Sequence, residues 1–181
     1  MKYTAEQRHA DIGTAEYISR FRDVPRFLAL CRQCPAYGKS WGCPPFGEDA
    51  DAWLSRYARV RIFAITVTPA EKDIPVNRAQ ELILPERMRI EHELLEMERR
   101  YNGRAMSYVG KCLYCPDRKC NRQDGKPCLH PEKVRPSLEA YGFDVGKTLK
   151  ELFGIDLQWS SDGMLPPQLT IVTALFHNGS F

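Results

Sequence analysis

Apolar residues follow strand-like and helical patterns along most of the chain. These patterns are interrupted by two stretches rich in cysteine, glycine and proline. Residues 59–69, RVRIFAITVTP, form the clearest predicted strand. Because apolar residues there point to both faces, the strand is expected at the centre of a sheet. Further strands are predicted at 104–110, 155–161 and 168–177.

Apolar residues at helical spacing predict the remaining regular structure. Residues 14–32 read as helix, with a break near Pro25. A longer helix is predicted at 85–101, because proline suits its first position and Gly103 suits its end. Shorter helical segments are predicted within 47–58 and at 78–84, 131–141 and 145–153.

These elements predict a single α+β domain spanning residues 1–181. The sheet has about four strands, mixed or antiparallel, with helices on one face and two cysteine-rich metal loops. A chain of 181 residues is long enough to bury a hydrophobic core without disulfides. Topology beyond this is not predicted.

Composition indicates a cytoplasmic protein. The N-terminus lacks the apolar core of a signal peptide, and no apolar run is long enough to span a membrane. The net charge of +3 is too small to indicate nucleic-acid binding by itself. All seven cysteines lie in the two interrupting stretches, and an odd number of clustered cytosolic cysteines is typical of metal ligands or redox groups.

The second cysteine loop, CLYCPDRKCNRQDGKPC, has the spacing C-x2-C-x4-C-x7-C. Four thiolates can hold a 4Fe-4S cluster or a tetrahedral zinc ion. Proline follows Cys34, Cys43 and Cys115, as in ferredoxin-like cluster loops, and zinc ribbons prefer two C-x2-C pairs. A 4Fe-4S cluster is therefore preferred over zinc. The predicted cluster ligands are Cys112, Cys115, Cys120 and Cys128.

The first cysteine loop, CRQCPAYGKSWGCPPF, contains only Cys31, Cys34 and Cys43, so a metal there would keep one open position. An open iron or zinc would be a catalytic device. Two other interpretations together carry equal weight: a histidine or carboxylate from elsewhere in the chain supplies the fourth ligand, or no metal binds. The candidate histidines are His9, His92, His130 and His177, of which His130 belongs more naturally to the second loop.

Residues 111–135 are basic, with seven cations against three anions. One interpretation is nucleic-acid binding beside a zinc site. The preferred interpretation is that these cations offset the negative charge of metal-bound thiolates. The residues are Lys111, Arg118, Lys119, Arg122, Lys126, Lys133 and Arg135, against Asp117, Asp124 and Glu132.

The segment RPSLEAYGFDV also offers polar side chains that can line a site beside the second loop. They are Arg135, Ser137, Glu139, Tyr141 and Asp144. Helix capping and packing explain the serine, the tyrosine and the aspartate equally well.

The two loops together with PEKVRPSLEAYGFDV resemble a family of small bacterial and archaeal proteins known as a predicted metal-binding domain of unknown function. The resemblance covers roughly residues 15–176, through C-x2-C-x2-Y-G-x3-W-x-C-P-P, G-x-C-x2-C and the later cysteines. It implies metal binding through these cysteines, with an iron–sulfur centre expected, and leaves the reaction and substrate open.

The leading hypothesis is an iron–sulfur protein that exchanges electrons with a redox protein partner. The alternative is a zinc-stabilised binding module that docks a nucleic acid or an acidic protein. A third is a metal-dependent enzyme acting at the first loop. Nucleic acid is the less favoured partner, because Tyr114 is the lone aromatic residue in the basic loop.

Overall fold

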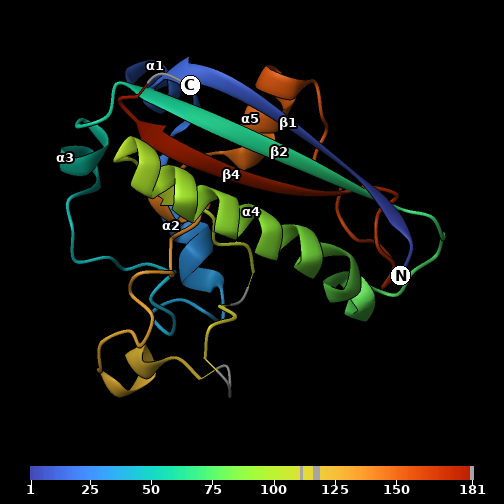
Figure 1. Ribbon diagram of the computed structural model, residues 1–181. Coiled ribbons are helices and arrows are strands. Elements are labelled where there is room, and N and C mark those ends of the chain that lie inside the picture. The colour runs from blue at the N-terminus through green and yellow to red at the C-terminus, as the bar shows by residue number, and fades with distance from the viewer. Residues whose placement is uncertain (111, 116–118, 180–181) are drawn as a thin grey trace.

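A four-stranded antiparallel sheet organises the chain, which the computed structural model describes for residues 1–110, 112–115 and 119–179 (Figure 1). The strand order is β1-β2-β4-β3. The predicted α+β fold is confirmed, and every strand pair is antiparallel. The strands are β1 (Tyr3–Gly13), β2 (Arg59–Pro69), β3 (Arg104–Met106) and β4 (Leu169–His177).

Strand β2 is central, as its apolar sequence predicts. It pairs with β1 along its whole length and with β4 from Arg59 to Val67. Ile62 packs into the core on one face of the sheet, and the next residue, Phe63, packs into the core on the other. Both faces of the sheet therefore need a covering layer.

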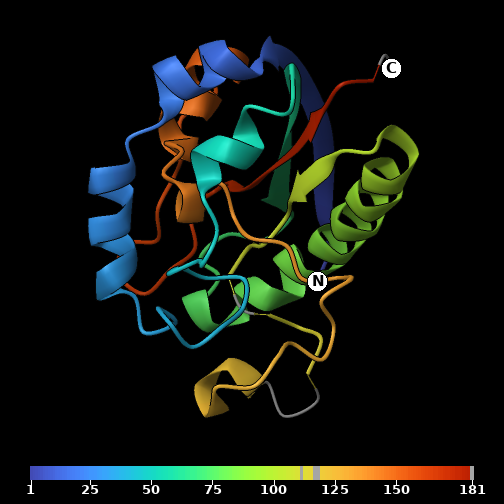
Figure 2. The same cartoon turned by 90° about the vertical axis from the view of Figure 1, so that its left-hand side faces the viewer.

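Helices lie on both faces of the sheet rather than on one (Figure 2). Helix α4 (Ala79–Tyr101) covers one face through Leu82, Ile90 and Leu94. The opposite face is covered by α1 (Thr14–Phe21), α3 (Ala50–Leu54) and α5 (Val145–Phe153). The arrangement follows from the apolar residues on both faces of β2 and β4, which a single helical layer would leave half exposed.

Strand β1 is absent from the sequence-based predictions. Its sequence, YTAEQRHADIG, lacks an apolar alternation, and most of its side chains are exposed. The strand forms because its backbone pairs with β2 at the edge of the sheet, from Tyr3 opposite Pro69 to Gly13 opposite Arg59. Pairing of this kind leaves little signal in a hydrophobicity pattern.

Several element boundaries differ from the predicted ones. Helix α4 begins at Ala79 and contains Pro85 in its interior, so segment 78–84 is largely part of the same helix. The predicted helix at 131–141 is reduced to the 3-10 turn η3 (Glu139–Tyr141), and no strand forms over 155–161. No helix in the described part of the chain is long and apolar enough to cross a membrane.

The predicted break near Pro25 separates α1 from α2 (Val24–Gln33), and η3 is bound to this break. The N–H of Asp23 donates to the carbonyl of Gly142 at 2.8 Å, and the N–H of Asp144 donates to that of Phe21 at 2.7 Å. These bonds hold residues 142–144, which directly follow η3, at the start of α2, the helix that leads into the first cysteine loop.

Replacement of Gly142 by alanine is expected to destabilise the contact between the start of α2 and the residues that follow η3. Gly142 has a φ of +90°, and an added Cβ would lie 2.8 Å from the Cα of Val24. The left-handed conformation costs about 1–2 kcal/mol, and the clash adds roughly 1–3 kcal/mol. Gly154→Ala is the matched control, because Gly154 also has a positive φ, of +69°, but no atom lies within 4 Å of the Cβ that alanine would add. Equal losses in the free energy of unfolding, measured by chemical denaturation, would contradict the prediction.

Candidate metal centre

The first cysteine loop starts in the last turn of α2. Cys31 lies in that turn, and Cys34 caps the helix by donating its N–H to the carbonyl of Cys31 at 3.0 Å. The chain then folds back, with the N–H of Gly38 donating to the carbonyl of Pro44 at 2.9 Å. This return brings Cys43 to the cavity that the other two cysteines also line, which measures about 510 Å³.

The second cysteine loop follows β3 and contains the short turn η2 (Asn121–Asp124). Gly125 ends this turn with a φ of +67°, a conformation that favours glycine and reverses the chain between Cys120 and Cys128. Two sulfurs receive backbone hydrogen bonds from the residue two positions later. Tyr114 donates to Cys112, and His130 donates to Cys128 at 3.4 Å.

The thiols form two groups, one for each loop. Burial raises the pKa of Cys112, and the charges of Cys115, Cys120 and Cys128 raise it further. Burial likewise raises the pKa of Cys31, followed by the charges of Glu139, Cys43 and Cys34. Within the described residues, however, no three His, Cys, Asp or Glu side chains converge closely enough to hold a metal ion.

Arg122 of η2 joins the second loop to the first. Its guanidinium donates to the carbonyl of Ser40 at 2.7 Å, to that of Cys43 at 2.5 Å and to that of Pro45. The same guanidinium lies 5.0 Å from the centre of the Trp41 ring. One cation therefore satisfies three carbonyls of a loop that has little regular structure.

Tyr108 lies between the two groups of thiols. Its hydroxyl is hydrogen-bonded to the side chains of Ser40 and Cys43, and it is close enough to Cys112 to interact with its charge. Burial raises the pKa of Tyr108 to about 12. A Cβ on Gly42 would lie 2.5 Å from the Tyr108 ring, so this glycine permits the close packing of loop and ring.

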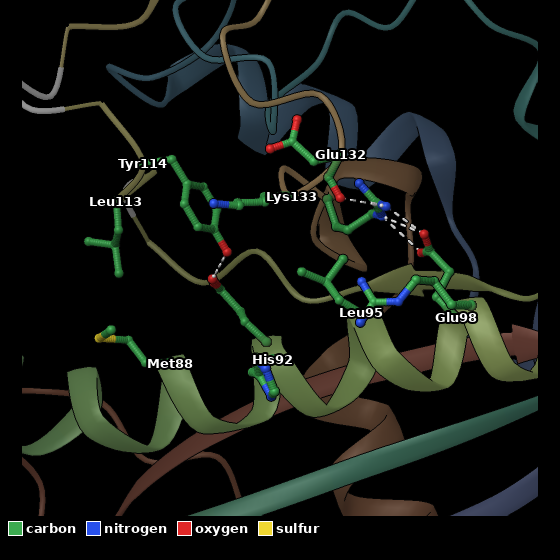
Figure 3. Close-up of a pocket in the computed structure, with 11 residues that line it drawn as sticks. Met88, His92, Leu95, Glu98, Leu113, Tyr114, Glu132 and Lys133 are labelled. Carbon is green, nitrogen blue, oxygen red and sulfur yellow. Dashed lines mark hydrogen bonds and ion pairs between the residues drawn. The ribbon is translucent and has the colours of Figure 1, made fainter.

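Helix α4 anchors the second loop from the other side (Figure 3). The Tyr114 hydroxyl donates to Glu91 at 2.8 Å, and Glu91 also accepts from Arg87 at 2.7 Å in a buried pair. Arg135 donates to Glu98 at 2.5 to 3.0 Å. Between these two anchors lies a cavity of about 600 Å³.

None of the four candidate histidines lines the cavity of the first cysteine loop, as far as the structure describes the chain. His9 lies on β1, His92 on α4 and His177 at the end of β4. His130 lies beside the second loop as predicted, with its ring 6.1 Å from that of Tyr114.

Most of the polar residues of the segment 135–144 have structural roles. Asp144 caps α5, Ser137 caps the backbone of η3, Tyr141 packs in the core, and Arg135 holds the second loop to α4. Glu139 differs from them, since it lines the cavity of the first loop instead of a site beside the second. Burial raises the pKa of its carboxyl group.

A family model described as predicted metal-binding protein (DUF2284) matches residues 19–176. The chain belongs to this family. The match includes all seven cysteines of this DUF2284 protein, so it supports metal binding at a coarse level and names no metal. No curated protein and no solved structure gives a significant match.

Substitution of Arg122 by methionine is expected to loosen the first loop of this DUF2284 protein. Hydrogen bonds to a charged donor contribute about 1.5–3 kcal/mol, so the backbone amides of residues 40–43 and 46 are expected to exchange roughly 10- to 100-fold faster. Amide hydrogen exchange measured by mass spectrometry checks this. Lys126→Met, a change of the same kind at an exposed position in the second loop, is the control. Unchanged exchange rates in the Arg122 variant would contradict the prediction that the hydrogen bonds of Arg122 stabilise the first loop.

Proposed function

We propose that Cys112, Cys115, Cys120 and Cys128 bind a 4Fe-4S cluster, and that the protein exchanges single electrons with a partner redox protein. The observation that supports this is a group of four thiols, two of which accept backbone N–H bonds. Four thiolates are the ligand set of such a cluster, and hydrogen bonds to the sulfurs raise its reduction potential. When bound, the cluster supplies one-electron redox chemistry.

The residues around the second loop fit this cofactor. The donor set is sulfur alone, which suits iron–sulfur clusters and zinc, and the proline after Cys115 favours the former. The thiols stand near one another without converging, so cofactor binding requires them to rotate inward. Anchoring of the loop to α4 through Tyr114 and Arg135 limits how far the rest of the loop moves with them.

The surface beside Cys128 suits a redox partner. Trp41, Cys128 and Pro131 line one hollow there, and the neighbouring Leu129 is 59% exposed. Lys126 is exposed in the same loop. A small apolar patch beside a cation fits transient docking of an acidic protein, which would bring its own redox centre close to the Cys128 edge.

The charges of the second loop favour this proposal over a zinc module that docks nucleic acid. Arg122 binds carbonyls of the first loop, Arg135 pairs with an acid of α4, and Lys119 lies 3.1 Å from Asp124. Cations engaged in this way are less available to phosphate groups. Three further charged residues of the basic stretch, Lys111, Asp117 and Arg118, lie outside the described residues.

Anaerobic purification followed by iron, sulfide and zinc analysis tests the cofactor. Brown protein with about four irons and matching sulfide is expected if the second loop alone binds a cluster, and about eight if both loops do. Cys115→Ser is expected to remove the second-loop share of visible absorbance, because one iron loses its thiolate.

Cys31→Ser is the matched control, since it removes a thiol from the other loop and is expected to leave about four irons per chain. Colourless protein that contains zinc and no sulfide would contradict the iron–sulfur proposal. Unchanged iron and sulfide in Cys115→Ser would contradict the ligand assignment.

A further inference from the structure

The cavity at the first cysteine loop has an unusual lining. Cys31, Cys34 and Cys43 all contribute to it, and most of its remaining described walls are apolar. Among the described lining residues, Glu139 is the one carboxylate, and no histidine is present. Three thiols and one carboxyl group therefore share a cavity of about 510 Å³.

Glu139 lies close to the thiols as well as in the same cavity. It begins η3, and η3 packs directly on α2, whose last turn contains Cys31. Of the charges that act on the Cys31 thiol, that of Glu139 has the largest effect, ahead of Cys43 and Cys34.

The backbone holds Glu139 in this place. Two backbone bonds tie the residues that follow η3 to the α1–α2 break, and the Arg22 side chain donates to the carbonyl of Tyr141, within η3, at 2.8 Å. A side chain on an element fixed in this way is suited to serve as a ligand, because little ordering is required when a metal binds.

Glu139 lacks a cationic partner within the described residues. Its carboxylate is hydrogen-bonded by the Ser137 hydroxyl and by its own backbone N–H, and no described lysine, arginine or histidine forms an ion pair with it. A carboxylate in a largely apolar cavity is costly unless a cation, a proton or a metal compensates its charge.

We infer that Glu139 is the fourth ligand of a metal site whose other ligands are Cys31, Cys34 and Cys43. Three thiolates and one carboxylate complete a tetrahedral set for zinc or ferrous iron. Metal binding draws the four side chains together, because they stand apart in this structure. The inference concerns the first loop and is independent of the cluster proposed for the second.

Chelator competition on the full-length, metal-stripped and reduced protein tests this ligand. The protein is titrated separately with Zn²⁺ and with Fe²⁺ under anaerobic conditions, and the tighter of the two identifies the preferred ion. Glu139→Gln keeps the shape of the side chain and removes its charge. This substitution is expected to raise the dissociation constant of one of the bound metal equivalents by at least about tenfold. Glu132→Gln, at an exposed carboxylate beside the second loop, is the control and is expected to leave the affinities for Zn²⁺ and for Fe²⁺ unchanged.

Glu139→Cys separates a ligand from a packing residue. Because the new cysteine supplies a fourth thiolate, the Glu139→Cys variant is expected to bind the metal more tightly than the Glu139→Gln variant. If Glu139 only packs, the Glu139→Gln variant, which keeps the shape of the side chain, is expected to bind more tightly. Wild-type affinity in Glu139→Gln, or no recovery in Glu139→Cys, would overturn the inference. Sulfide analysis of the protein as purified, before its metal is removed, reports on the second loop separately, so failure of the cluster proposal would leave this result interpretable.

Discussion

The hydrogen bonds from the Arg122 guanidinium to three carbonyls of the first loop hold the two cysteine loops together. The first loop, which is rich in glycine and proline, pairs only some of its carbonyls with its own N–H groups, and an unpaired partly buried carbonyl is costly. Arginine is suited to this position because its planar group presents several donors in fixed directions and keeps its charge. Thiols that are 81 residues apart in sequence, such as Cys31 and Cys112, thereby belong to one structural unit.

The sheet and its helices place this unit at one end of the molecule (Figures 1 and 2). The first loop leaves α2, and the second follows β3 and is anchored on α4. Because α2 is tied to η3 and α4 packs on the central strands, each loop starts from a rigid element. Loops positioned by a stable scaffold are where proteins most often place their chemistry.

The sequence predicts the parts of this structure that depend on local patterns. The strand at 59–69, the helix at 145–153 and the grouping of the cysteines by loop all have short-range signals. The alternating apolar residues at 155–161 mislead, because Ile155 and Leu157 pack against the core without pairing to a strand. The roles of Tyr108, Arg122 and Glu139 depend on contacts between distant segments. No spacing rule reveals which basic residue reaches the other loop, or which carboxylate faces it.

Strand β1 gives the sheet an outer edge, since it pairs with β2 alone in the described part of the chain. An edge of 11 residues exposes a long row of backbone donors and acceptors that another chain can extend into an aggregate. Its exposed charged side chains, Glu6 and Arg8 among them, oppose such growth by repulsion and by the cost of dehydrating them. The polar sequence that makes this strand hard to recognise from hydrophobicity is therefore also what protects the edge from aggregation. A typical apolar strand at this position would be easier to predict from the sequence but more prone to aggregate.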